Sequence, residues 1–98
     1  MPQVTITRHD HPTHGEYRAK VEGFEQTGVL TYKKRDGGSV LAADHTIVPT
    51  ELRGQGIAGE LVRALIADAR KESTKIVPLC SYVEAAFRRH PEWSDLRA

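Results

Sequence analysis

The passage from residue 48 to residue 70 constrains the fold of this chain most strongly, because the sequence changes its period there. Before it, apolar and polar residues alternate at every second position, which is typical of half-buried strands. After a run of small residues, apolar side chains recur at helical spacing, namely Ile57, Leu61, Leu65 and Ala69, flanked by Ala58, Val62 and Ile66. A strand, a glycine-rich turn and an amphipathic helix therefore follow one another directly.

The residues before this passage predict strands joined by tight turns. Residues 1–15 are read as a short edge strand plus a turn, and residues 16–22, 24–33 and 39–48 as further strands. Arg35-Asp36-Gly37-Gly38 is a hairpin signal, since glycine adopts positive φ at little cost. The strand over residues 39–48 is apolar on both faces except at Asp44 and His45, so we expect it to be central.

The residues after the helix predict a return to the sheet. Residues 75–79 are β-branched and favour a strand parallel to residues 39–48, joined to it by the helix as a crossover. Ser81-Tyr82-Val83-Glu84 has the pattern of a capping box, with Ser81 as N-cap, and opens a helix through about Arg89. We therefore expect an α+β domain over residues 1–98, with a mostly antiparallel sheet and one parallel βαβ crossover.

Length, charge and cysteine usage exclude several classes of function. With 98 residues, the chain fits one small domain, and a monomer is compatible with that size. Its 14 basic and 13 acidic residues leave a net charge of +1, so we expect no nucleic-acid partner and no membrane partner. The one cysteine, Cys80, forms no internal disulfide and suits a reducing compartment, so we expect a cytoplasmic protein.

The glycine-rich turn at residues 53–59 is a candidate anion site. A helix begins with about four backbone N–H groups that lack partners, and its dipole makes that end positive. The small residues there let an anion approach these groups, and Arg53 adds a planar cation suited to phosphate oxygens. The alternative is a turn that needs glycine only for its backbone angles.

Arg53-x-x-Gly56-x-Ala58, placed after a strand and before a helix, resembles the acyl-CoA-binding motif of GCN5-related N-acetyltransferases. The passage from residue 45 to residue 96 is similar to the small single-domain, YjdJ-like branch of that superfamily. The similarity rests on His-Thr-x-Val, the glycine turn, and Cys-x-Tyr-Val followed by His-Pro-Glu. It implies the acyl-CoA N-acyltransferase fold, in which the central strand and the next parallel strand splay apart.

The resemblance also implies acetyl-CoA as co-substrate and no metal. By position, the turn amides would hold the pyrophosphate; they belong to Arg53, Gly54, Gln55, Gly56, Ile57 and Ala58. Ile47 and Val48, on the strand that leads into the turn, would line the pantetheine arm. Larger members of the superfamily carry a helical insertion after the first strand that builds the acceptor pocket. This chain has no room for one, so we expect a shallow, open acceptor side.

His45 is the candidate general base. Strict alternation places it on the strand face of Leu41, Ala43 and Ile47, with Asp44 on the other face. An acceptor amine arrives mostly as ammonium and must lose a proton before it attacks the thioester, and histidine is suited to that transfer. The alternative is a hydrogen-bonded core histidine.

Cys80 is the candidate group on the thioester side, across the splay from His45. A cysteine beside a helix N-terminus can have its thiolate favoured by the dipole. It could accept the acetyl group and pass it on, or only protonate the departing CoA thiolate. The alternative is an inert, buried small side chain.

These features lead to three hypotheses of function. The first is an N-acetyltransferase that moves acetyl from acetyl-CoA to an amine of a small molecule, an exposed lysine or a protein N-terminus. The second is a non-catalytic acyl-CoA-binding module, and the third a structural domain without a CoA site. His9, His11 and His14 have spacing compatible with zinc, but no matching ligand follows, so we expect no metal.

Overall fold

The computed structural model describes residues 3–98, so Met1 and Pro2 of the expected N-terminal strand lie outside the described residues. The sheet has five strands in the order β1-β2-β3-β4-β5. The strands and the two main helices are β1 (Val4–Asp10), β2 (His14–Val21), β3 (Thr27–Arg35), β4 (Val40–Ile47), α1 (Ile57–Glu72), β5 (Lys75–Pro78) and α2 (Ser81–Arg89). Short 3₁₀ turns are η1 (Asp36–Gly38), η2 (Thr50–Leu52) and η3 (Pro91–Leu96). Only β4 and β5 pair in parallel. The expected α+β fold is confirmed.

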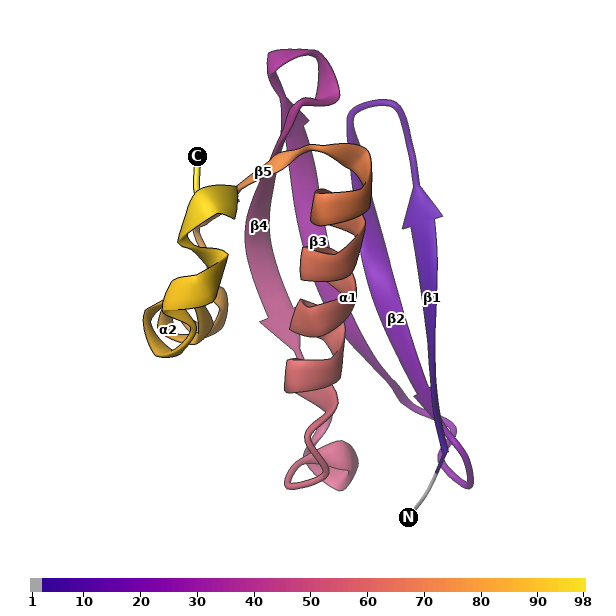
Figure 1. Cartoon of the computed structure of the whole chain (residues 1–98). Helices are drawn as coiled ribbons and strands as arrows, with labels where there is room; N and C mark the ends of the chain where they lie inside the picture. The colour runs from indigo at the N-terminus through magenta and orange to yellow at the C-terminus, as the bar shows by residue number, and fades with distance from the viewer. Residues whose placement is uncertain (1–2) are drawn as a thin grey trace.

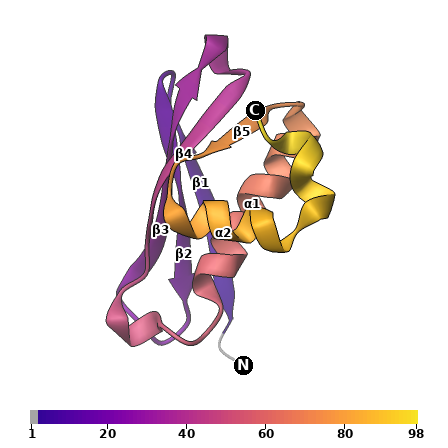
Figure 2. The same ribbon diagram turned by 90° about the vertical axis from the view of Figure 1, so that its left-hand side faces the viewer.

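Both helices pack on one face of the sheet (Figures 1 and 2). The alternation predicted for β2 holds, since Tyr17, Ala19 and Val21 are buried beneath α1. The predicted stripe of α1 is also buried, apart from Ala58. Within the described residues, the opposite face carries no helix and is open (Figure 2). The domain is thus two layers, with one apolar core between the helices and the sheet.

A β-bulge in β4 corrects the predicted placement of His45. The pairing with β3 shifts by one residue, from Tyr32 opposite Ala43 to Thr31 opposite His45. Because residues that pair directly share a face, Ala43 points to the helices and His45 to the open face. His45 therefore shares a face with Ile47, as expected, but not with Leu41 and Ala43. Strict alternation failed here because it assumes an uninterrupted ladder.

Asp44 is the extra residue of this bulge; it lies on the face opposite Leu41 and Ala43, as expected, but shares that face with His45, which was not expected. Its carboxylate accepts a hydrogen bond of 2.6 Å from the hydroxyl of Thr31. Thr31 is on the open face, so Asp44 and His45 both lie on that face beside one residue of β3. The bulge thus gathers an acid and an imidazole where the sheet is uncovered.

The β4–β5 pairing is short and ends in a split. The ladder runs only from Val40–Lys75 to Ala43–Pro78, whereas β4 continues to Ile47. The carbonyl of Ala43 accepts from the N–H groups of Leu79 and Cys80, at 3.0 and 2.9 Å. Beyond it the chain turns into α2, and the β5-facing edge of β4 has no strand beside it among residues 3–98. β4 lies between β3 and β5 in the sheet order, but it is the penultimate strand rather than the middle one.

The N-terminus of α2 differs from the predicted capping box. Cys80, not Ser81, is the N-cap, because its carbonyl accepts the first helical hydrogen bond, from Glu84 N–H at 2.9 Å. The Glu84 side chain pairs with Arg97 at 2.8 Å and Arg88 at 3.4 Å instead of returning to the cap. The helix therefore begins directly after the only cysteine.

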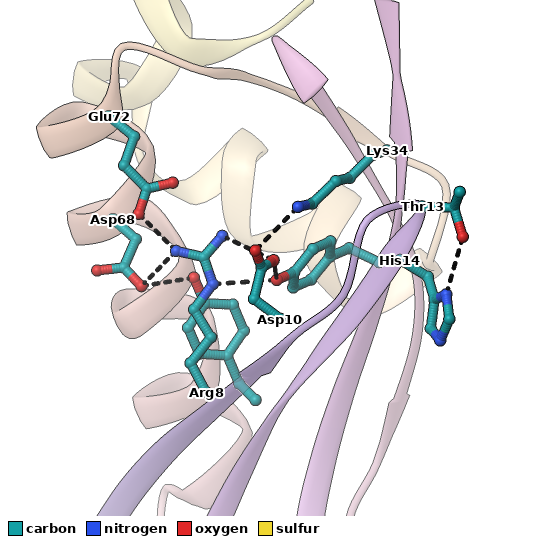
Figure 3. A network of polar contacts seen from close by, with 9 residues as sticks. Arg8, Asp10, Thr13, His14, Lys34, Asp68 and Glu72 are labelled. Atoms are coloured by element: carbon teal, nitrogen blue, oxygen red, sulfur yellow. Dashed lines mark hydrogen bonds and ion pairs between the residues drawn. The ribbon is translucent and has the colours of Figure 1, made fainter. Parts of the chain in front are cut away.

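A partly exposed polar network lies at the edge of the core, at the C-terminal end of α1 (Figure 3). Arg8 of β1 reaches between sheet and helix, with its guanidinium 2.6 Å from Glu72 and 3.2 Å from Asp68. Its Nε donates to the Tyr32 hydroxyl at 3.0 Å. That hydroxyl in turn donates to Asp10, whose carboxylate also pairs with Lys34 at 2.9 Å. The edge strand β1 pairs through its backbone with β2. The ion pairs of Arg8 tie it to α1 as well.

Asp10→Asn is expected to remove an acid-sensitive part of the stability. Donation from Tyr32, followed by Lys34, lowers the pKa of Asp10 below its usual 3.8. A carboxyl with a depressed folded-state pKa stabilises above its unfolded pKa, and that stabilisation is lost as the pH falls through the folded value. Urea unfolding should therefore show the parent more stable than Asp10→Asn near pH 6, with the difference shrinking below about pH 4. A difference that stays constant down to about pH 2 would contradict this.

Candidate functional site

The glycine turn between β4 and α1 requires left-handed backbone at two positions. Gly54 has φ of +83° and Gly56, the N-cap of α1, has φ of +72°. Side chains other than glycine cost about 1 kcal/mol or more in this region. The glycines are therefore needed for their backbone angles, which agrees with the conformational interpretation of the turn.

The same turn also leaves the first backbone donors of α1 free, as an anion site requires. The first helical bond runs from Glu60 N–H to Gly56 carbonyl at 3.1 Å, so the amides of residues 57–59 precede it. No side chain of residues 3–98 caps this end. Free donors and the positive end of a 16-residue helix together favour an anion here.

A pocket of about 230 Å³ opens at this helix end. Its wall includes six residues from the turn and the adjoining strand end that the sequence had pointed to: Val48, Arg53, Gly54, Gly56, Ile57 and Ala58. Leu52, Gly59 and Tyr82 complete it. Gln55 lies outside the wall, with its amide 3.5 Å from the Glu51 carbonyl. The side chain of Ile47 is also outside, 63% exposed on the open face.

Cys80 lies at the start of α2, half-buried against the core. Its thiol donates to the Thr46 hydroxyl over 3.5 Å. Burial raises the pKa of the thiol, but contacts with the Thr46 hydroxyl and with the backbone N–H groups of Tyr82, Val83 and Thr46 outweigh burial, so that the pKa is lowered. These contacts do not amount to a regular side-chain cap of α2. The thiolate is nevertheless favoured relative to a free cysteine.

The predicted pair of His45 and Cys80 is only partly brought together. Cys80 meets Thr46, which pairs with Leu30 and so points to the helix-covered side. His45 is the preceding residue and is exposed on the open side. The two side chains therefore flank the split edge of β4 from opposite faces, and no hydrogen bond joins them among the described residues.

A family model described as GCN5-related N-acetyl-transferase matches residues 16–96. The chain belongs to the GCN5-related N-acetyltransferase family. The match runs from within β2 to the end of η3, and so includes the glycine turn, the bulge and Cys80. The fold that the resemblance implied is the one observed. The YjdJ-like branch stays a prediction, and β1, which supplies Arg8 and Asp10, lies outside the match.

Two residues of this N-acetyltransferase-family site were missed or misjudged from the sequence. Thr46 was not singled out, because only the bulge turns it toward Cys80. Tyr82, which the sequence placed only within the capping pattern, is 36% exposed and lines the pocket. Its position in the first turn of a helix was the available signal. Tyr32, by contrast, is buried.

The histidines of the β1–β2 hairpin lie far from this site along the chain. The rings of His11 and His14 stack at 4.8 Å, and Nε2 of His9 lies 3.5 Å from the Thr7 hydroxyl. Within residues 3–98, no three His, Cys, Asp or Glu side chains are grouped as a metal ion would need. The same residues contain no helix that is both long enough and apolar enough to cross a bilayer.

Proposed function

We propose that this protein is an acetyl-CoA-dependent N-acetyltransferase that acetylates a primary amine. The observation that carries the proposal is the pocket at the free N-terminus of α1, which opens beside the split between β4 and the start of α2. A diphosphate needs such a donor-rich end, and an extended thioester arm needs such a gap. Family membership supports both assignments.

The turn amides of Gly54, Gln55, Gly56, Ile57 and Ala58 would bind the diphosphate of acetyl-CoA, whereas the expected Arg53 amide already donates to the Thr50 carbonyl at 3.2 Å. The Arg53 guanidinium is exposed, with only a 3.4 Å contact from Nε to the Val48 carbonyl, so its remaining donors are available to phosphate oxygens. The apolar side chains of Val48 and Ile57 would cover the first part of the pantetheine arm.

The pantetheine arm would extend from the pocket into the split beside β4. The thioester at its end would then be accessible from both faces of the sheet. The backbone of Ile47 and Val48 would flank the arm there, because no strand covers that edge of β4 within residues 3–98. The thioester would then lie between Cys80 on one side and His45 on the other. An acceptor approaching the open face would meet His45 first.

His45 would act as the general base. It takes a proton from the acceptor ammonium, and the free amine attacks the thioester carbonyl carbon. The tetrahedral intermediate collapses with cleavage of the C–S bond, giving an amide and the CoA thiolate, which takes up a proton. Cys80 could supply that proton. Alternatively, the Cys80 thiolate could attack the thioester carbonyl carbon before the amine does. This releases the CoA thiolate and leaves an acetyl-cysteine, from which the amine then takes the acetyl group.

The acceptor side of this site is open. Within residues 3–98, the β1–β2 connection is a short turn at residues 11–13 that contains no helix, and His45 is exposed. We therefore propose an amine on a large partner, such as a protein lysine or N-terminus, as readily as a small molecule. The free thiol of Cys80 suits a reducing compartment, so we propose a cytoplasmic location.

His45→Gln is expected to lower acetyl transfer about a hundredfold while leaving acetyl-CoA affinity unchanged, because a general base contributes to the reaction and not to cofactor binding. CoA release would be followed with lysine peptides, N-terminal peptides and small diamines as acceptors, alongside calorimetry with acetyl-CoA. His9→Gln, another exposed histidine on the sheet, serves as the control and should retain full rate. Full rate in His45→Gln would rule out this base.

A non-catalytic acyl-CoA-binding module remains the second candidate, favoured by the placement of His45 and Cys80 on opposite sides of β4. The same assay separates the two. A module binds acetyl-CoA but releases no CoA above hydrolysis with any of these amines.

A further inference from the structure

We propose that Thr46 is the positioning residue that holds the Cys80 sulfur at the split edge of β4. The inference deepens the acetyl transfer proposed above and rests on it for its purpose. The contact itself can be tested in the protein alone.

The bulge in β4 is what makes Thr46 available. Leu41 and Ala43 face the helices, so an unbroken strand would also turn residue 45 toward them and residue 46 toward the open face. The extra residue, Asp44, reverses this order. Thr46 then pairs with Leu30 on the helix-covered side and reaches Cys80. Because of the bulge, the side chain of Thr46, and not that of His45, lies next to the thiol.

Thr46 contacts the sulfur through its hydroxyl group. Its hydroxyl oxygen lies 3.5 Å from Sγ and accepts from the thiol, and it can rotate to donate once the thiol has lost its proton. The Cys80 backbone is fixed in turn by donation to the Ala43 carbonyl at 2.9 Å. The sulfur is therefore held from β4 by the Thr46 hydroxyl, at the start of α2.

The other titratable groups on the two flanking elements are directed elsewhere. Asp44 and His45 of β4 lie on the open face. Glu84 of α2 is paired with Arg88 and Arg97. Tyr82 lines the pocket at the glycine turn. Within the described residues, the Thr46 hydroxyl is therefore the side-chain group that is hydrogen-bonded to Sγ.

Thr46→Val keeps the shape of the side chain and removes the hydroxyl, and Thr46→Ser keeps the hydroxyl. Iodoacetamide alkylation of the ligand-free protein, measured against pH, reports the thiolate. We expect the Thr46→Val profile to move to higher pH, because the thiolate loses its side-chain donor. Alkylation at neutral pH should be about fourfold slower, since a tenfold smaller thiolate fraction is partly offset by the greater nucleophilicity of a more basic thiolate. Thr46→Ser should follow the parent.

Two results would overturn this role. Superimposed profiles for all three proteins would show that the hydroxyl does not act on the sulfur. An equal displacement in Thr46→Val and Thr46→Ser would assign the effect to shape. Thermal unfolding of each variant checks that the fold is kept, and Thr46→Ala replaces Thr46→Val should the latter not fold. The assay contains no acetyl-CoA, so its outcome is independent of whether acetyl transfer occurs.

Discussion

Gly56→Glu is expected to lower the affinity for acetyl-CoA about a thousandfold. A Cβ at Gly56 meets nothing within 4 Å, so the new side chain has room to extend into the pocket that Gly56 lines. Its carboxylate would then lie where the diphosphate is proposed to bind, beside the free amides of α1. Like charges placed together cost several kcal/mol, and about 4 kcal/mol corresponds to a thousandfold in affinity.

Gly37→Glu is the matched control for this experiment. Gly37 has φ of 69° and ψ of 19°, against 72° and 18° at Gly56, so both variants carry the same backbone strain and the same added charge. It lies in the β3–β4 turn, at the other end of the sheet from the start of α1 (Figure 1), and its Cβ also has open space. Calorimetry should show parental affinity for Gly37→Glu. Equal affinities for acetyl-CoA in the two variants would show that the diphosphate does not bind at this turn.

Gly15→Ala is expected to destabilise the domain by about 3 kcal/mol, a large share of the stability of a small domain. A Cβ there would lie 2.2 Å from the Tyr32 hydroxyl oxygen and 2.4 Å from the ring carbon that bears it. Tyr32 is 1% exposed and cannot move without releasing Arg8 and Asp10 from the network of Figure 3. Urea unfolding measures the loss.

Gly59→Ala is expected to stabilise the domain in the same urea unfolding measurement. Its Cβ would make only ordinary contact, 3.5 Å from the Arg63 guanidinium, inside α1. Alanine is favoured over glycine in a helix by up to about 1 kcal/mol, so this variant should unfold at higher urea than the parent. A Gly15→Ala protein as stable as the parent would show that Tyr32 is not fixed by Gly15.

The elements of this fold could be predicted from the sequence because each carries its own period. The stripe of α1 and the alternation in β2 are local patterns, and each was found where expected. Element ends were less certain. The strand expected to begin at Phe24 begins at Thr27, because Phe24 packs against the core outside the strand.

The arrangement of the site could not be predicted in the same way, because it depends on register between strands. A single extra residue at Asp44 decides which of His45 and Thr46 faces the helices, and no pattern within β4 announces it. The network around Arg8 joins residues 60 or more positions apart, so spacing along the chain gives no sign of it. The Cys80 cap was obscured by a Ser-x-x-Glu pattern whose glutamate pairs with Arg97 instead.

The central claim is that the free amides at the start of α1 bind the diphosphate of acetyl-CoA. A titration of the ¹⁵N-labelled protein with acetyl-CoA, followed by amide chemical shifts, tests it most directly. The account predicts saturable changes concentrated in residues 53–58, with smaller ones at Val48 and Cys80 and none in the β3–β4 turn. Unchanged spectra at millimolar acetyl-CoA, or changes confined to residues away from the turn, would contradict it.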